Sequence, residues 1–373
     1  MERRLILKNI DYVFLTFIIG ILVMSALVLS SATLNVSHDP FYYVKKQVLF
    51  IILGLAAMIF MMFINYGNLR KYHRFIYVGT IIILIFALTT GKYSRGIPVG
   101  PFFLQPSEFA KVGIIITFAH YLTQRKGKLN TLRDLIPCFA HVGLPMLLIL
   151  PGDLGTSLVF VAILFGMLFT AGANPKLLTG IIAIGMAAII LILVAHFQFG
   201  LQLPLKEYQL MRLVVFTNPY NDGMNGRGYG YNIIQSQVAI GSGGLLGKGL
   251  YRGSQVQLNF LPEHHTDFIF SVVGEELGFV GAVVLLGAYF GIIYRSLMIA
   301  MNAKDMFGTL LAAGVASMIF FHVTENVGMS IGLMPITGIP LPMFSYGGSS
   351  MLSNMLAAGL VLNIYMRRQK IRF

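Results

Sequence analysis

The residue best placed to do chemistry is Asp267, an acid at the junction between a hydrophilic segment and an apolar run. It follows LPEHHT at 261–266 and precedes an apolar stretch that begins at Phe268. Both water-borne and lipid-borne groups can reach a carboxylate at such a boundary, and partial burial can tune its pKa so that it accepts a proton from a hydroxyl group. A cap of the following helix by Thr266 or Asp267 explains the same spacing equally well. The spacing alone therefore leaves a general base and a helix cap as alternatives.

Glu108 and Lys111 form a second candidate group, in the segment QPSEFAK at 105–111. Their spacing places both side chains on one face of a helix, where they can neutralise each other, and Pro106 and Ser107 suit the start of that helix. An ionisable residue at membrane depth costs roughly 2.5–3.5 kcal/mol on insertion scales, so each one is a candidate for function. Two alternatives remain, an ion pair that holds the bundle together and a site for a charged substrate group.

Further polar residues lie within or between apolar stretches. Asp153 occupies a very short turn, where capping of the next helix is a sufficient explanation. Glu325 and Asn326 interrupt an apolar stretch near His322, so they must face the interior of a bundle or a wet cavity. A functional site and an internal polar network are equally consistent with this second cluster.

The segment PITGIPLP at 335–342 cannot form a regular helix, because its prolines lack donors and restrict the preceding residues. It leads into FSYGGSS at 344–350. Non-helical backbone at membrane depth is tolerated where it lines a cavity or is buried in protein, although small residues also permit close helix packing. The candidate supporting residues in this segment are Ser345, Gly347, Gly348 and Ser349.

The chain that must position these residues is 56% apolar and only 11% charged, with a mean hydropathy of +0.77 over 373 residues. A span needs roughly 20 apolar residues to cross about 30 Å of hydrocarbon. Ten stretches qualify, so we predict an all-α polytopic membrane protein with one transmembrane domain over residues 1–373. The predicted spans are residues 11–31, 47–65, 74–90, 107–123, 135–151, 155–172, 176–197, 267–294, 306–334 and 345–366.

The distribution of Lys and Arg predicts that both termini lie in the cytoplasm. With the N-terminus inside, the inner segments carry 17 of these residues and the outer segments nine, five of them in one long loop where the rule has little force. The net charge of +13 therefore reflects orientation in a membrane, and we expect no nucleic-acid partner. The single cysteine, Cys138, excludes an intrachain disulfide and a cysteine-based metal site.

The long loop, residues 198–266 between the seventh and eighth spans, is predicted to be extracellular and structured, because unstructured loops of this length are unusual. Apolar residues recur at helical spacing over 206–216 and 231–240, which predicts two short helices at the membrane surface. Ten glycines between 221 and 253 permit tight turns and close approach to a ligand. A flexible external loop is the alternative.

Taken together, six segments resemble the SEDS family (shape, elongation, division and sporulation). They follow the family's order over nearly the whole chain, and they are QPSEFAK at 105–111, DLGTS at 153–157, GYNIIQS at 230–236, AIGSGG at 239–244, FLPEHHTDFIFSVVGEELG at 260–278 and GIPLPMFSYGGSS at 338–350. The segment GSQVQLNF at 253–260 is similar to the elongation branch of that family.

The resemblance implies a peptidoglycan glycosyltransferase that polymerises lipid II on the outer face of the bacterial cytoplasmic membrane and releases polyprenyl pyrophosphate. It implies that the residue at the position of Asp267 is essential and is the favoured catalytic carboxylate, and that the pair matching Glu108 and Lys111 is also important. It further implies a partner within the elongation machinery, a class B penicillin-binding protein that acts as transpeptidase.

The leaving pyrophosphate of such a reaction carries negative charge, which a nearby cation would stabilise. The sequence does not choose among the candidates, which are Lys111, Arg212, Arg227, Lys248 and Arg252. The sequence assigns no certain cofactor. The involvement of a divalent cation is left open, because the acidic residues do not show the spacing of a metal site.

The competing hypothesis is a lipid carrier, a flippase that moves lipid II across the bilayer, since intramembrane charges and broken helices also fit a transporter. No inverted repeat is evident, however, and the conspicuous residues gather at one surface. A non-catalytic scaffold would leave Asp267 dispensable. We find no Walker-type phosphate loop, so we expect no ATP-driven transport.

Overall fold

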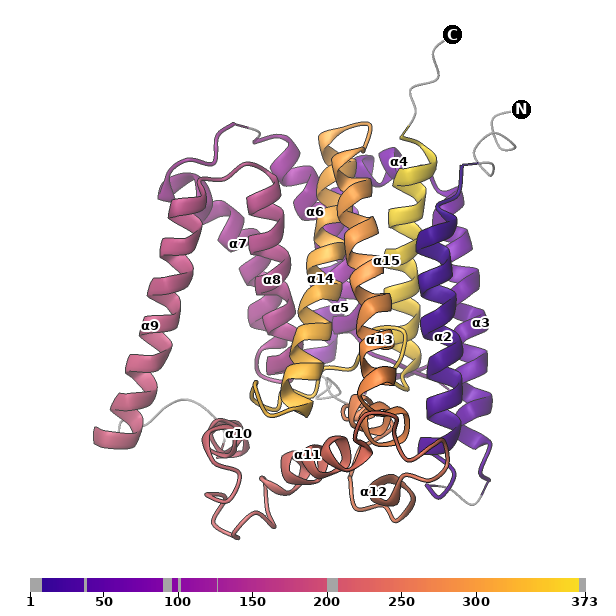
Figure 1. Cartoon of the computed structure of the whole chain (residues 1–373). Helices are drawn as coiled ribbons and strands as arrows, with labels where there is room; N and C mark the ends of the chain where they lie inside the picture. The colour runs from indigo at the N-terminus through magenta and orange to yellow at the C-terminus, as the bar shows by residue number, and fades with distance from the viewer. Residues whose placement is uncertain are drawn as a thin grey trace.

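The computed structural model describes residues 9–36, 39–89, 96–99, 102–125, 127–199 and 207–368. In this part of the chain ten long helices form a bundle, and each corresponds to one predicted span (Figure 1). They are α2 (Tyr12–Ala32), α3 (Tyr42–Phe63), α5 (His73–Thr89), α6 (Pro106–Thr123), α7 (Leu132–Ile149), α8 (Leu154–Thr170), α9 (Pro175–Phe199), α13 (Ile269–Met301), α14 (Met306–Ser330) and α15 (Gly348–Met366). Basic residues used to predict orientation that lie outside the described residues are Arg3, Arg4, Lys8, Lys92, Arg95, Lys126, Lys206, Lys370 and Arg372.

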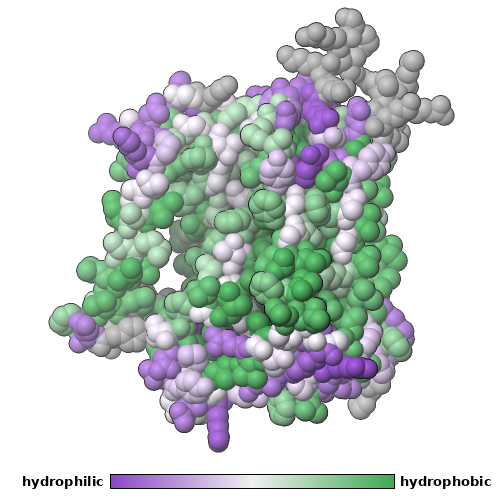
Figure 2. All heavy atoms as spheres, viewed as in Figure 1, coloured by the Kyte–Doolittle hydropathy of each residue, from purple (hydrophilic) through white to green (hydrophobic). Residues whose placement is uncertain are grey.

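The prediction of an all-α polytopic membrane protein is confirmed. Seven of the described helices are long and apolar enough to cross a membrane by length and composition alone. The other three are α5 and α8, which are shorter, and α6, which carries Glu108 and Lys111. Figure 2 shows an apolar belt between two hydrophilic rims, as expected for a protein surrounded by lipid. A small antiparallel hairpin, β1 (Ile97–Val99) with β2 (Phe102–Leu104), was not predicted.

The bundle has two distinct ends (Figure 1). The start of α2, the short helix α4 (Tyr66–Lys71) and the end of α15 lie at one end, which we call the terminal end. The helices α10 (Glu207–Thr217), α11 (Tyr231–Gly243) and α12 (Ser254–Gln257) lie at the other, which we call the loop end. An even number of spans places the first and the last helix ends on the same side, as observed for the start of α2 and the end of α15.

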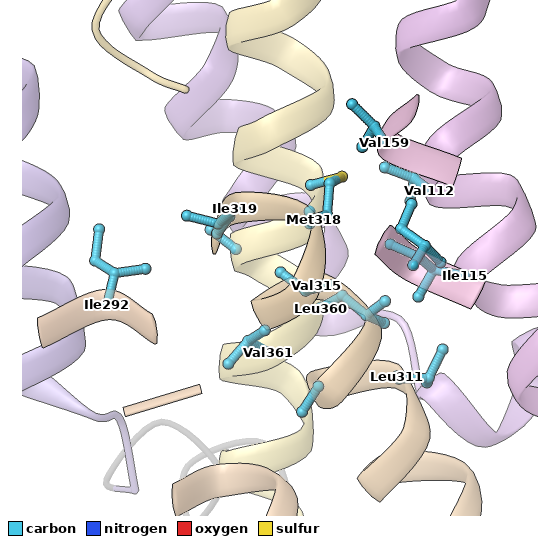
Figure 3. Close-up of a cluster of buried hydrophobic side chains, with 14 of the residues drawn as sticks. Val112, Ile115, Val159, Ile292, Leu311, Val315, Met318, Ile319, Leu360 and Val361 are labelled. Atoms are coloured by element: carbon cyan, nitrogen blue, oxygen red, sulfur yellow. The ribbon is translucent and has the colours of Figure 1, made fainter. Parts of the chain in front are cut away.

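The centre of the bundle is formed by α14 and α15, which are buried over most of their surfaces. The helix α14 packs against α13, α8 and α6, and α15 packs against α3. Figure 3 shows Val315, Met318 and Ile319 of α14 gathered with Leu360 and Val361 of α15. Small residues are frequent in both helices, and they allow helices in a membrane to approach closely.

The predicted eighth span is interrupted, because Gly278 has a non-helical conformation (φ 65°, ψ −164°) inside α13. A strap from the long loop crosses the kink, where the N–H groups of Phe279 and Val280 donate to the carbonyl oxygens of Gly244 and Leu245 at 2.9 and 3.1 Å. These bonds replace the helical ones that the kink removes, so the interruption leaves the backbone satisfied.

Several predicted boundaries were wrong. The helix α13 continues to Met301 instead of ending near 294, which places Arg295 inside the helix, where it pairs with Asp11 at 2.5 Å. The helix α14 ends at Ser330 instead of 334, and α15 begins at Gly348 instead of 345. The two boundaries lie on either side of the proline-rich segment. The non-helical stretch between the two helices is therefore longer than apolar composition predicts.

The prediction that the long loop is structured is confirmed for its described part, residues 207–266. The two predicted surface helices are α10 and α11, whereas α12 was not predicted. Between α10 and α11 the carboxylate of Asp222 accepts backbone N–H bonds from Met224, Gly226, Gly228 and Gly230 at 2.7–3.2 Å. These bonds lower the pKa of Asp222 to about 2, against the effect of burial, which raises it, so the side chain holds the glycine-rich turn together.

Candidate functional site

A cavity of about 1070 Å³ lies at the loop end of the bundle. Its walls come from the start of α6, the turn before α8, the helix α10, the segment 263–267, the non-helical segment 335–347 and the start of α15. Met186 and Ile189 of α9 add an apolar wall, and α9 itself stands apart from the rest of the bundle along most of its length (Figure 1). The cavity therefore has a charged part and an apolar part, as a ligand with both characters requires.

Asp267 lines this cavity and is half-buried. Asn326 of α14 fixes its backbone, because the Asn326 amide donates to the carbonyl oxygen of Asp267 at 2.8 Å and to that of Ile339 at 2.7 Å. On the other side Gly338 (φ 75°) approaches the carboxylate so closely that an added Cβ would lie 3.2 Å from Oδ2. The segment before α13, the helix α14 and the proline-rich segment thus meet at Asp267.

The predicted alternative that Thr266 or Asp267 caps the next helix was wrong. The N-cap position of α13 is Phe268, and no side-chain hydrogen bond caps this helix. The Thr266 hydroxyl donates to Glu263 instead. Burial raises the pKa of Asp267 to about 6, the Glu263 carboxylate adds to the rise, and the Arg212 guanidinium opposes it.

Glu108 and Lys111 form an ion pair, with 2.8 Å between Lys111 Nζ and Glu108 Oε1. Lys111 also contacts His322 Nε2 at 2.9 Å, and His322 Nδ1 lies 3.2 Å from the carbonyl oxygen of Pro340. Because a carbonyl oxygen can only accept, Nδ1 carries the ring proton and Nε2 accepts from Lys111. Ser353 of α15 donates to the other Glu108 oxygen at 3.0 Å. Glu108 lines the cavity, whereas Lys111 lies behind it.

Asp153 caps α8, as predicted, and accepts from the backbone N–H of Thr156 at 2.8 Å and from its hydroxyl at 2.6 Å. It also lines the cavity and accepts from the Gln105 amide at 3.4 Å. Burial raises the pKa of Asp153, and the hydrogen bonds from Thr156 oppose that rise. Asp153 therefore both caps α8 and lines the cavity.

Three of the four small residues predicted to support a site line the cavity, namely Gly347, Gly348 and Ser349. The Ser349 hydroxyl accepts from the Gln105 N–H at 2.9 Å and donates to the Phe103 carbonyl at 2.8 Å, which joins α15 to the strand that precedes α6. Ser345 is buried and does not line the cavity, and its hydroxyl accepts from the Leu341 N–H at 2.9 Å. Its observed contact is within the bend of the segment.

The predicted cations separate in space. Arg212 of α10 lines the cavity, and its guanidinium donates to the Thr337 carbonyl at 3.4 Å. Lys248 forms an ion pair with the buried Glu275 at 2.7 Å, away from the cavity lining. Arg227 and Arg252 are exposed on the loop and do not line the cavity either. Among the candidate cations, the geometry brings Arg212 closest to the chemistry that Asp267 could perform.

Sequence reasoning missed Lys46 of α3, which lines the cavity. Its ammonium group lies 2.5 Å from the Tyr42 hydroxyl and 4.3 Å from the centre of that ring. The sequence indicated for Lys46 only a position just before the second predicted span. The sequence also contained no sign that Tyr346 would line the cavity and pack against Tyr43, with 5.1 Å between the ring centres.

The described residues contain no group of three or more His, Cys, Asp or Glu side chains arranged to hold a metal ion. The carboxylates on the cavity wall are Glu108, Asp153, Glu263 and Asp267, and the cations are Lys46 and Arg212. Glu108 is neutralised by Lys111, Asp153 caps α8, Glu263 is exposed, and Asp267 is half-buried with a raised pKa. A site with such a carboxylate and nearby cations can accept a proton beside a bound anion.

A family model described as a cell cycle protein, which covers FtsW, RodA and SpoVE, matches residues 8–370. The chain belongs to this family. The FtsW, RodA and SpoVE proteins are the SEDS family that the sequence motifs resemble, so the predicted family is confirmed.

Two relatives illustrate the range of the family. The chain is 36% identical to the peptidoglycan glycosyltransferase MrdB of Escherichia coli (strain K12), over 97% of this chain and 95% of that protein. It is also 36% identical to the probable peptidoglycan glycosyltransferase FtsW of Geobacter metallireducens, over 88% of this chain and 86% of that protein. The identities are equal, so they do not separate the branches of the SEDS family.

A solved structure of a peptidoglycan synthase complex contains a chain with the same fold. Its TM-score is 0.77 and its sequence identity 27%, over 96% of this chain and 98% of that one. This SEDS protein is therefore a multi-pass membrane protein whose fold extends over the whole length of its relative.

Proposed function

We propose that this protein is a peptidoglycan glycosyltransferase that polymerises lipid II at the outer face of the bacterial cytoplasmic membrane. The observation that carries the proposal is the half-buried Asp267 carboxyl, of raised pKa, on the wall of a large cavity that also contains Arg212. The volume of about 1070 Å³ is slightly above the usual range of about 300–1,000 Å³ for ligand pockets, which leaves room for large substrates. The names of the relatives support the same activity.

The mechanism follows from the positions of the charges. The ionised Asp267 accepts the proton of the GlcNAc 4-hydroxyl of one lipid II molecule, and that oxygen forms a bond to C1 of the MurNAc of a second molecule with inversion. The bond from C1 to the pyrophosphate oxygen breaks, and the electron pair leaves with polyprenyl pyrophosphate. Arg212 stabilises the charge that develops on the leaving group.

Other residues of the cavity bind and orient the substrates. Lys46 offers a second positive charge on another wall, so two anionic headgroups can each find a cation. The apolar side chains of Met186 and Ile189 provide a surface for the polyprenyl chains, which remain in lipid. The buried Glu108 and Lys111 pair adds no net charge and fixes the start of α6 against α14 and α15.

We further place the chain in the elongation branch, RodA, on the segment at 253–260, with both termini in the cytoplasm. Its partner is then a class B penicillin-binding protein, the transpeptidase of the elongation machinery. The similarity to a chain of a peptidoglycan synthase complex supports this partnership. The partnership is tested by copurification of the two proteins, once with the wild type and once with Asp222→Ala. This change removes the acceptor of four backbone hydrogen bonds in the loop.

The activity is tested by glycan formation from lipid II in detergent, where translocation is not needed, with the purified protein and its penicillin-binding partner. Long glycan products are expected from the wild type and none from Asp267→Asn. Asp39→Asn is a matched control, because Asp39 lies near the same surface in an exposed ion pair with Lys45 that is worth little. Polymer from Asp267→Asn, or flipping of lipid II in liposomes without any polymer from the wild type, would favour the lipid carrier.

A further inference from the structure

Glu325 is a buried carboxyl that the proposed mechanism does not use. It lies in α14 with only 1% of its surface exposed, and neither of its oxygens has a hydrogen-bond partner among the described residues. The Thr337 hydroxyl interacts with this carboxyl but does not reach normal hydrogen-bond geometry. A carboxyl so placed is unusual, because buried polar groups are nearly always paired.

The position of Glu325 ties it to Asp267. Its neighbour Asn326 donates to the backbone of Asp267 at 2.8 Å, so this turn of α14 is fixed against the segment that carries Asp267. The two carboxyls interact electrostatically, and both interact with Arg212. Asp267 and Thr337 line the cavity, whereas Glu325 does not. Glu325 is therefore buried outside the cavity lining, out of contact with a substrate in the cavity.

The other charged groups near this pair are accounted for. Asp267 also faces Glu263 on its own segment and Asp153 from the turn before α8. Lys111 of α6 is paired with Glu108 and with His322, which precedes Glu325 by three residues on α14. Both carboxyls interact with the Arg212 guanidinium, in an environment where an unpaired ion is strongly disfavoured.

We propose that Glu325 and Asp267 form a two-carboxyl pair that holds one proton in the active state, with Glu325 neutral and Asp267 ionised. Glu325 is then a positioning residue, because it keeps the negative charge of the pair on the carboxyl that faces the substrate. Two carboxyls that interact electrostatically do not readily ionise together. The proposal rests on the proposed function, since the charge on Asp267 matters only if Asp267 is the base.

The proton balance of the cycle follows. The acceptor hydroxyl loses its proton to Asp267 as the new glycosidic bond forms, so both carboxyls are then neutral. One proton returns to water through the cavity, from Asp267 directly, and the pair regains its single negative charge. Above the pH at which the pair loses its second proton, a dianion faces the pyrophosphate of the substrate, and repulsion lowers the rate.

The test is the pH profile of glycan formation by the full-length protein with its partner. The wild type should show a rise as the pair loses its first proton and a fall as it loses its second. In Glu325→Gln the rise should stay in place, the plateau rate should remain within about threefold, and the fall should move at least about one pH unit higher. Glu325→Asp restores a titrating group and should keep the fall.

Ser317→Ala is a matched control on the same helix, since the Ser317 hydroxyl donates to the Ala313 carbonyl of its own helix, at 2.9 Å. Its profile should coincide with that of the wild type. A Glu325→Gln profile that also coincides with the wild type, or a loss of activity as complete as in Asp267→Asn, would overturn the shared proton. Absence of polymer from the wild type would instead reject the proposed function.

If Glu325→Gln does not fold, the infrared spectrum of the wild type and of Glu325→Asp shows whether Glu325 carries the proton. The wild type at neutral pH should contain a protonated-carboxyl band that changes frequency in Glu325→Asp. A band that is the same in both proteins would show that the proton is not on Glu325.

Discussion

Lys111 has none of its surface exposed, and its ammonium group is held between Glu108 and His322 at 2.8 and 2.9 Å. Removal of one partner from such a pair leaves an uncompensated buried charge, which costs about 3–5 kcal/mol. We therefore expect Glu108→Gln to lower the unfolding temperature in detergent strongly. The double variant Glu108→Gln with Lys111→Met should recover part of the loss, because it removes both charges. Additive losses in the double variant would contradict the ion pair as the source of the effect.

The raised pKa of Asp267 predicts the acid side of the pH profile. A general base must be ionised, so with a pKa of about 6 the rate of glycan formation should rise as the pH passes about 6. At one pH unit below the pKa of Asp267 the rate should be roughly tenfold lower than on the plateau at higher pH. The sign for stability is opposite, because the folded state binds this proton more tightly than the unfolded chain. The stability from Asp267 is present below its ordinary pKa of 3.8 and is lost as the pH rises through about 6.

Rates measured between pH 5 and pH 8 test this prediction, with Asp39→Asn as the control that should not change the profile. A rate that is flat across this range would mean that Asp267 is already ionised at pH 5, as an unburied carboxyl would be.

At the scale of elements, the ten helices could be predicted because a helix that crosses the membrane needs an apolar stretch of nearly fixed length. Such stretches are visible directly in the sequence. The kink in α13 could not, because the strap that satisfies it comes from residues 244–249, and only tertiary contact brings them to Gly278. The helix α12 escaped prediction for a related reason. Its N-terminus is held by the Glu275 carboxylate of α13, which accepts from the N–H groups of Gln255 and Val256 at 3.0 and 3.3 Å.

The kink itself leads to a prediction about glycine. Gly278 has a backbone conformation that costs about 1–3 kcal/mol for other residues, and an added Cβ would lie 2.2 Å from the Gly247 nitrogen. Gly278→Ala should therefore lower the unfolding temperature and loosen the strap. Gly287→Ala in the same helix is the control, because its Cβ would meet nothing within 4 Å and alanine favours helix by up to about 1 kcal/mol. Equal effects of both changes would show that the kink does not restrain the loop.

At the scale of the molecule, sequence reasoning could identify most of one site but could not assemble it. Asp267, Glu108 and Gly347 are conspicuous because each is polar or conformationally special next to apolar sequence, and all three line the cavity. The choice of cation was different. Lys46 and Lys248 are both basic residues outside the predicted spans, and only the packing of α3 and of the loop places one in the cavity and the other against Glu275. Periodicity contains no information about such long-range pairs.

The distribution of charge also predicts how the whole molecule sits in a membrane. More Lys and Arg residues lie in the connections at the terminal end, so this end should face the cytoplasm and α10–α12 the outside. A cysteine at Met224, which is 66% exposed on the loop, should react with a membrane-impermeant maleimide in intact cells. A cysteine at the exposed Lys71 of α4 should react only after the cells are opened. The wild type is a suitable control because its single cysteine, Cys138, is buried. Labelling at Lys71→Cys in intact cells, without labelling at Met224→Cys, would invert the orientation and move the cavity to the cytoplasmic side, where a polymerase that builds an external wall could not use it.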